Sequence, residues 1–192
     1  MKNLVSTILV VTLLGIAPGV LSQQHSQQMT TARAAKTLSY DVAIDARTFR
    51  IHDDINPFAS NPPAISRGNA FFVNGKIYPG GTIPAGENVF SPDNDGSLGN
   101  WICRGIFLVN FADIVAGAPI HVDTTQLFRF DDGAALVTEG LEGAVPTLRA
   151  LTGGMGDFSG ASGEVHQELL GTNTTGMFNI RLTFEIKKKS IN

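Results

Sequence analysis

Apolar and polar residues alternate along most of the chain, which is the pattern of half-buried β-strands. The clearest segment is the last, where every second residue from Phe178 to Ile186 is apolar. No window sustains the 3.6-residue spacing of an amphipathic helix, so we expect little helix. We predict eight strands, at residues 39–46, 69–78, 100–110, 120–130, 134–141, 147–153, 161–171 and 177–187.

The connections between these segments are of two kinds. Asp131–Gly133 and Gly171–Gly176 are short turns that favour hairpins. The segments 53–68 and 79–99 are long and proline-containing, which is typical of lids, binding loops or disordered loops. Consecutive strands without helical crossovers predict an all-β fold: an antiparallel, eight-stranded closed barrel with two long loops at its rim. The interior of such a barrel is either filled by side chains or holds one small ligand.

The N-terminal part of the chain departs from this alternation. Lys2 precedes the mainly apolar run Leu4–Ile16, which is too short to span a membrane and is typical of a secretory signal peptide. We predict a signal peptide over 1–22 with cleavage near Ser22, a flexible spacer over 23–37, and a single barrel domain over 38–192. The protein is then secreted or periplasmic and has no membrane association after processing.

Composition excludes several classes of protein. Charged residues make up 16% of the 192 residues, and glycine is frequent, which argues against coiled coils and disordered chains. The formal net charge of −3 provides no electrostatic footprint for nucleic acid. A single cysteine, Cys103, cannot close an internal disulfide, so it is either buried or paired between chains.

The stretch Leu148–Val165 resembles a signature of allene oxide cyclases and plant dirigent proteins. Its parts are the glycine-rich turn Thr152–Gly156, the aromatic Phe158 and the small-residue strand that begins at Ala161. Glycines there permit positive φ and close approach of strands, as a sharp corner of a small barrel requires. The flanking strands also fit, from Leu98 to Lys187. The resemblance implies the barrel, a cyclase or isomerase reaction without a cofactor, and a homodimer or homotrimer.

The resemblance does not extend to the active site of the plant cyclases. Those enzymes place a cysteine in the third strand where this chain has Phe107, and Cys103 lies four positions earlier. Their acidic-plus-asparagine substrate motif has no convincing match in Tyr40–Asp45. The resemblance therefore carries the barrel and the class of reaction, whereas the catalytic residues stay unknown.

Glu139 and Cys103 are the candidate catalytic residues. Glu139 shares a strand face with apolar neighbours, so it is either a buried, tuned carboxyl group or a residue at the barrel rim. Cys103 is either a nucleophile, which requires a lowered thiol pKa, or a small buried apolar residue. The same-face pairs of His121 with Asp123 and His166 with Glu168 lack a third ligand, so we predict no metal site.

Aromatic residues are the candidates for substrate binding. If the face of Trp101, Cys103 and Phe107 points inward, Trp101 either lines a cavity or plugs one end of the barrel. Arg104 would then lie outside among apolar residues, which fits a subunit interface. We predict that the substrate-binding residues are Tyr40, Tyr78 at the rim, Trp101, Phe107 and Phe128.

Two main functions fit these observations. The first is a secreted, cofactor-independent cyclase or isomerase, or a dirigent-like protein, that folds a reactive hydrophobic small molecule inside the barrel. The alternative is a lipocalin-like binding protein for a hydrophobic molecule, without catalysis. A third interpretation is an interaction protein whose own phenylalanines fill the barrel.

Overall fold

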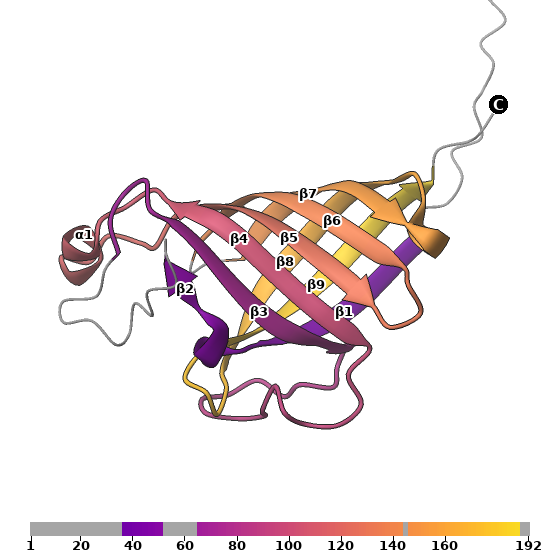
Figure 1. The fold of residues 1–192 in the computed structure, drawn as a ribbon, viewed down its shortest axis with the longest axis horizontal. Helices are drawn as coiled ribbons and strands as arrows, with labels where there is room; N and C mark the ends of the chain where they lie inside the picture. The colour runs from indigo at the N-terminus through magenta and orange to yellow at the C-terminus, as the bar shows by residue number, and fades with distance from the viewer. Residues whose placement is uncertain (1–35, 52–64, 144–145, 189–192) are drawn as a thin grey trace, which may run out of the picture. The chain divides into compact units, whose positions relative to one another are not determined.

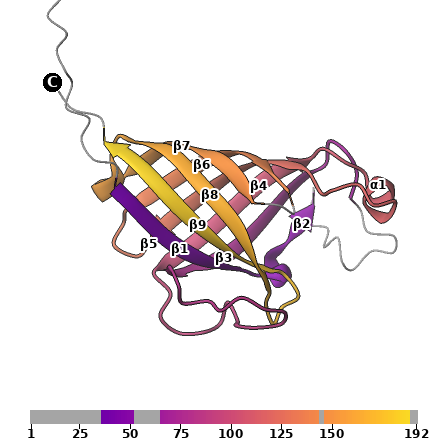
Figure 2. The same cartoon turned by 180° about the vertical axis from the view of Figure 1, so that it is seen from behind.

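A computed structural model describes residues 36–51, 65–143 and 146–188. Its nine strands form one antiparallel sheet: β1 (Lys36–Ile44), β2 (Arg50–Ile51), β3 (Ala70–Pro79), β4 (Gly99–Phe107), β5 (Val122–Phe130), β6 (Ala135–Glu142), β7 (Thr147–Met155), β8 (Ala161–Thr172) and β9 (Phe178–Lys188). Sequential neighbours pair from β3 to β9, and β1 pairs with both β9 and β3 (Figures 1 and 2). These pairings close eight strands into a barrel, which confirms the predicted fold class.

The elements agree closely with the predicted pattern. Each of the eight predicted segments coincides with a barrel strand, and both predicted hairpin turns are present. The short elements β2 and α1 (Phe111–Val115) were not predicted, because neither is long enough to show a period. The predicted signal peptide and most of the predicted spacer lie outside the described residues. No helix in the described ranges is long and apolar enough to cross a membrane.

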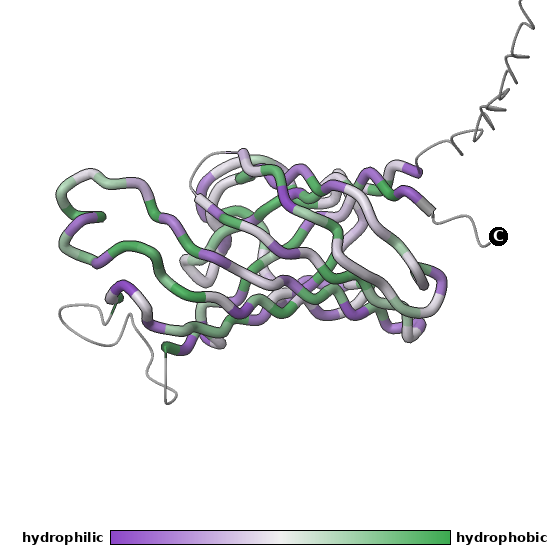
Figure 3. The backbone as a smooth tube through the Cα atoms, turned by 90° about the horizontal axis from the view of Figure 1, so that it is seen from above, coloured by the Kyte–Doolittle hydropathy of each residue, from purple (hydrophilic) through white to green (hydrophobic). Residues whose placement is uncertain are grey.

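Strand alternation places the core inside the barrel. Figure 3 shows hydrophobic and hydrophilic residues following one another along the strands. The inward residues include Trp101, Phe128, Leu136 and Phe184, each at most 1% exposed. Aromatic contacts continue toward one mouth, where Tyr40 lies 5.0 Å from Phe130 between ring centroids. Such a core supplies most of the hydrophobic stabilisation of the fold.

The glycine-rich segment forms a tight corner between β7 and β8. A Cβ atom at Gly154 would lie 2.4 Å from the Phe158 carbonyl oxygen, and one at Gly163 would lie 1.9 Å from the Glu185 carbonyl oxygen. Gly163 also has φ of 150°, which disfavours any other residue. Glycine is required at these two positions because neighbouring backbone atoms leave no room for a Cβ atom, as expected from the sequence.

The long loop between β3 and β4 packs on the outer face of the barrel. Ile83 of this loop lies in a second apolar cluster with Ala43 of β1, Tyr78 of β3 and Leu170 of β8. The loop backbone also pairs with the end of β8, where Gly86 N donates to the Leu170 carbonyl at 2.9 Å. Residues 79–99 therefore form an ordered loop that is attached to the outer wall, and the alternative of a disordered loop does not hold.

Candidate active site

A cluster of polar side chains lies inside the barrel, around the end at which β5 begins and β6 finishes. Its members occupy inward positions of four adjacent strands, where alternation otherwise places apolar residues. They are Thr124 and Gln126 of β5, Thr138 and Glu142 of β6, Arg149 of β7 and Gln167 of β8. Buried polar groups require hydrogen-bond partners, and these residues supply them to one another.

Glu142 is at the centre of this cluster. Its Oε1 atom accepts hydrogen bonds from Gln126 Nε2 at 2.7 Å and from Arg149 Nη1 at 3.0 Å, and it also accepts one from the Thr124 hydroxyl. Its Oε2 atom accepts from Gln167 Nε2 at 3.3 Å. The side chain is 16% exposed. Oε1 is thus crowded with donors, whereas Oε2 has spare acceptor capacity and some access to solvent.

Arg149 is the counter-ion that holds Glu142. Its side chain is 0% exposed, and it also donates to the Thr138 hydroxyl at 3.2 Å and to the carbonyl groups of Gly140 and Thr124 at 3.1 and 3.0 Å. Burial lowers the pKa of Arg149, and the charge of Glu142 opposes this shift. A guanidinium bound on so many sides is fixed in place, so it positions the Glu142 carboxylate.

Cys103 borders the cluster from β4. Its Sγ atom lies 3.9 Å from Glu142 Oε1. Burial raises the pKa of the Cys103 thiol well above its ordinary value, and the charge of Glu142 acts in the same direction. The thiol therefore stays protonated near neutral pH, which favours the interpretation of Cys103 as a buried side chain over that of a nucleophile.

Aromatic residues form the apolar wall beside the cluster. Trp101 lies opposite Phe128 in the pairing of β4 with β5, and the Phe128 ring is 5.1 Å from that of Phe184. Phe107 lies at the same end of the barrel as Glu142, since both pair with Val122, and its ring centroid is 4.9 Å from that of Phe71. Of the predicted substrate-binding residues, Tyr40, Trp101, Phe107 and Phe128 thus face the interior.

Two predicted site residues lie elsewhere. Tyr78 is buried on the outer face beneath the loop before β4, where its hydroxyl donates to the Asn94 carbonyl at 2.9 Å. It cannot line the interior, so the prediction of a rim position in the site is corrected. Glu139 is exposed on the outer wall, which corrects the expectation of a buried or rim carboxyl group.

The local sequence of β6 does not show which of its faces points inward. Glu139 was placed with Val137 and Leu141, yet Leu141 is 58% exposed on the outside. The inward face carries Leu136, Thr138 and Glu142. Because both faces of β6 contain apolar residues, hydrophobicity alone indicates the wrong one. The more buried face becomes evident only when the partner strands are known.

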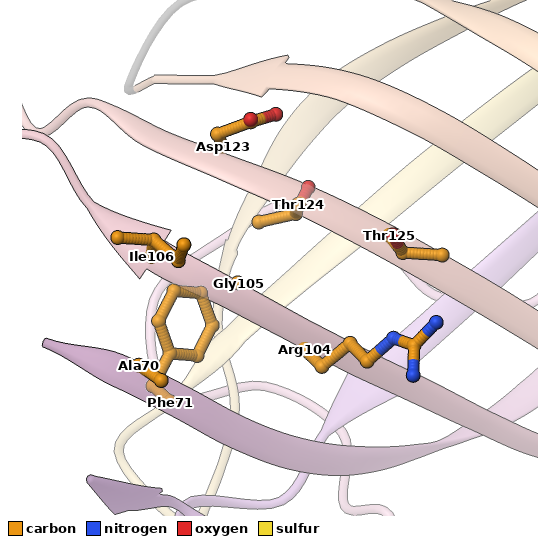
Figure 4. A pocket seen from close by; sticks show the side chains of 8 residues that line it. All are labelled: Ala70, Phe71, Arg104, Gly105, Ile106, Asp123, Thr124 and Thr125. Carbon is orange, nitrogen blue, oxygen red and sulfur yellow. The ribbon is translucent and has the colours of Figure 1, made fainter. Parts of the chain in front are cut away.

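Two pockets border the barrel wall and mouth. One, of about 350 Å³, lies at the mouth opposite the polar cluster and is lined by Lys36, Asp157, Phe158, Ser159, Ala161 and Ile186. The other, of about 320 Å³, lies at Gly105 of β4, with Arg104 and Asp123 on opposite sides of it (Figure 4). Within the described ranges, no group of three or more His, Cys, Asp or Glu residues is arranged to hold a metal ion.

Comparison with known proteins supports the fold. No protein-family model and no curated protein matches the sequence. The solved structure of the pterocarpan synthase dirigent protein PsPTS1 matches with a TM-score of 0.56 and 11% identity, over 83% of this chain and 99% of that one. The dirigent protein GePTS1, also a pterocarpan synthase, matches with a TM-score of 0.55 and 14% identity, over 94% of this chain and 100% of that one.

A pyocyanin demethylase is also similar, with a TM-score of 0.48 and 16% identity over 77% of this chain and 98% of that one. At these identities the likeness concerns the fold alone. The predicted resemblance to dirigent proteins is thus confirmed for the barrel. The resemblance to allene oxide cyclases stays a prediction.

Proposed function

We propose that this protein is an exported, cofactor-independent cyclase, isomerase or dirigent-like protein that folds a reactive apolar substrate inside its barrel. The observation that carries the proposal is the arrangement of Glu142. Its carboxylate is fixed by Arg149 at the border of an apolar interior, and its Oε2 atom keeps spare acceptor capacity. A positioned base in a largely dry site is what proton transfer during a ring closure or isomerisation requires.

The two parts of the interior have separate roles in this proposal. The aromatic wall of Trp101 and Phe128 holds a flexible substrate in one folded conformation, which lowers the entropic part of the barrier. Glu142 Oε2 accepts a proton from the substrate or stabilises positive charge that develops on it. Arg149 keeps the carboxylate in place throughout.

In this proposal the substrate enters through the mouth pocket, at the end of the barrel opposite Glu142. Its volume of about 350 Å³ lies within the ~300–1,000 Å³ typical of small-molecule sites. Ala161 and Ile186, which line it, belong to the inward faces of β8 and β9. An apolar substrate that reaches this mouth therefore contacts the core directly.

Export and self-association belong to the same proposal. The apolar run Leu4–Ile16 supports export. The outer wall supports self-association, because Ile106, Leu141 and Leu148 are 47%, 58% and 57% exposed. N-terminal sequencing of the exported protein and sedimentation of the purified protein would test these two points.

The main experiment uses substrates that cyclise spontaneously in water and yield both enantiomers. The protein should accelerate the reaction or produce an excess of one enantiomer, measured by chiral chromatography. Glu142→Gln should lower the accelerated rate by about 100-fold or more, because general base catalysis typically contributes that much. Glu139→Gln is the matched control: it removes a carboxylate from the outer face of the same strand and should change neither rate nor product ratio.

The possible results separate the candidate functions. Retention of apolar molecules with no change in rate or enantiomeric ratio would replace the proposal with the lipocalin-like carrier. Failure to retain any apolar molecule would indicate a barrel that serves only as a structural or interaction unit. Equal losses in Glu142→Gln and Glu139→Gln would remove Glu142 from the mechanism.

A further inference from the structure

The interior contains unused hydrogen-bonding capacity. In the described part of the chain, Trp101 Nε1 and Thr147 Oγ1 are the buried side-chain nitrogen or oxygen atoms that lack a hydrogen-bond partner. Both residues occupy inward positions, Trp101 on β4 and Thr147 on β7. Native proteins leave few such atoms unpaired, so each requires a physical account.

Both atoms belong to residues that flank the Glu142 cluster. Trp101 is the inward neighbour of Cys103, about 6.6 Å along the strand, and the Cys103 sulfur lies 3.9 Å from Glu142 Oε1. Thr147 is the inward neighbour of Arg149 and lies opposite Gln167 in the pairing of β7 with β8. The two unpaired atoms, Trp101 Nε1 and Thr147 Oγ1, therefore belong to residues on two sides of the Glu142 cluster.

The indole nitrogen is the more specific of the two atoms. An indole N–H can only donate, so it needs an acceptor. The residues opposite Trp101 in the two neighbouring strands are Phe128 and Gly75, and neither has a side-chain acceptor. A buried N–H without a partner is destabilising, and an incoming acceptor atom would remove that cost.

We propose that Trp101 Nε1 donates a hydrogen bond to an acceptor oxygen of the substrate, a carbonyl or an ether, while Glu142 Oε2 accepts a hydrogen bond from a hydroxyl group of the same molecule. Thr147 Oγ1 is a further contact on the side of Glu142. The inference rests on the proposed function and specifies its substrate class: an apolar molecule that carries a carbonyl or ether oxygen and a hydroxyl group. A site that is built to pair with such groups discriminates strongly against analogues that lack them.

The first test needs no variant. Trp101 is the only tryptophan in the sequence, so a ¹⁵N-labelled sample gives a single indole N–H resonance. The protein is titrated with indanone, and with indane, which has the same bicycle without the carbonyl. Indanone should bind at least about fivefold more tightly than indane, as expected for pairing a buried donor. It should also shift the indole proton downfield, whereas indane should not.

Variants then separate the N–H from the ring. Trp101→Phe keeps an aromatic ring but removes the donor, so it should abolish the preference for indanone while it still binds indane. Phe128→Leu is the matched control, since it alters the neighbouring wall without removing a polar atom. Phe128→Leu should lower the affinities for indane and indanone by the same factor. Hydroxyindanone tests Glu142 separately, because Glu142→Gln replaces a charged acceptor with a neutral amide and should therefore reduce the gain in affinity from the hydroxyl group.

Each result has one meaning. Equal binding of indane and indanone by the wild-type protein, with a gain for hydroxyindanone that depends on Glu142, would overturn the role of Trp101 and leave the proposed function standing. An indole proton that stays hydrogen-bonded in all samples would show that a trapped water is its partner, which also overturns the inference. Failure of all three molecules to bind would overturn the inference and the proposed function together.

Discussion

Two carboxylate–arginine pairs lie on opposite sides of the barrel wall, and they differ in solvent exposure and in how firmly the less-used carboxylate oxygen is held. Asp41 on the outer face is 0% exposed, and it accepts hydrogen bonds from Arg181 Nε at 2.7 Å, Arg181 Nη2 at 3.0 Å, Gly81 N at 2.9 Å and Ile83 N at 2.8 Å. These donors occupy both oxygens. The pair fastens the long loop to β1 and β9.

Glu142 inside the barrel has the same division of donors, three nitrogen or oxygen donors on one oxygen and one on the other, but its second oxygen is held less firmly. The donors from β5 and β7 converge on its Oε1 atom, and Oε2 has the longer contact with Gln167. Burial of a charged group therefore does not by itself indicate a functional site, because Asp41 is fully buried and serves to attach a loop. A carboxylate that is sealed from solvent and held at both oxygens by an arginine has a structural role. Glu142 is instead 16% exposed and its Oε2 has a single contact at 3.3 Å, so this oxygen can still accept a proton or a ligand.

The largest expected effect is on stability when the inner pair is broken. Glu142→Gln leaves the fully buried Arg149 guanidinium without its counter-charge, which should lower the free energy of unfolding by about 3–5 kcal/mol. The double variant Glu142→Gln with Arg149→Met should recover most of that loss, because it removes both charges. Urea denaturation measures both variants. A double variant as unstable as the single one would contradict the view of Arg149 as a counter-ion.

The activity of the double variant separates a catalytic role of Glu142 from a structural one. If Glu142 provides the base, the double variant regains stability and stays inactive. Activity that returns with stability would assign Glu142 a purely structural role, and the contrast with Asp41 would then disappear.

Asp41→Asn is the matching change in the outer pair, with the next-largest expected effect. It should lower the free energy of unfolding by about 3 kcal/mol, at the low end of the range for broken buried pairs, because Arg181 is 27% exposed and can contact water. Indanone binding and the indole resonance of Trp101 should not change at temperatures where the variant is folded. A loss of ligand binding in this variant would show that the loop shapes the interior.

Cys103 lies beside the inner pair, and its burial should make the free energy of unfolding depend on pH. Its pKa is raised in the folded state, so the unfolded chain releases the thiol proton first, near the ordinary pKa of about 8.5. The folded state then binds more protons than the unfolded state, and stability falls as pH rises above that value.

The expected slope is at most about 1.4 kcal/mol per pH unit. Urea denaturation of the reduced protein between about pH 7 and about pH 9.5, below the range where tyrosines titrate, measures it. Cys103→Ala should flatten this part of the curve. An unchanged slope in that variant would mean that another group titrates there.

The sequence predicts the strands of this barrel well, but not the polar network inside it. Alternation alone predicts all eight barrel strands, but it leaves open whether the face of Trp101 and Phe107 points inward, and the structure shows that they lie in the interior with Phe128. Alternation fails for Glu142 because the outer face of β6 is also apolar. The Glu142 network joins residues up to 41 positions apart, from four strands other than that of Glu142, so no local motif encodes it.

The outer pair escaped prediction for a related reason. Asp41 and Tyr78 are buried only because the loop before β4 folds back over the barrel, and nothing in the local pattern of β1 or β3 predicts that cover. The prediction of a long loop at residues 79–99 is confirmed, although the loop lies on the outer wall and not at the rim, and most of the predicted loop 53–68 lies outside the described residues. The docking of residues 79–99 on the wall depends on contacts with β8 and β9 that lie far away in sequence.

The smallest expected effect comes from Tyr78→Phe. The Tyr78 hydroxyl donates to the Asn94 carbonyl at 2.9 Å, and its ring contacts Phe90 with centroids 4.9 Å apart. Removal of the hydroxyl keeps the ring contact and should lower the free energy of unfolding by about 1 kcal/mol, the net value of one hydrogen bond. Because Tyr78 lies outside the barrel, the affinity for indanone should stay at the wild-type value. A changed affinity would place Tyr78 in communication with the interior and restore the original prediction that it belongs to the binding site.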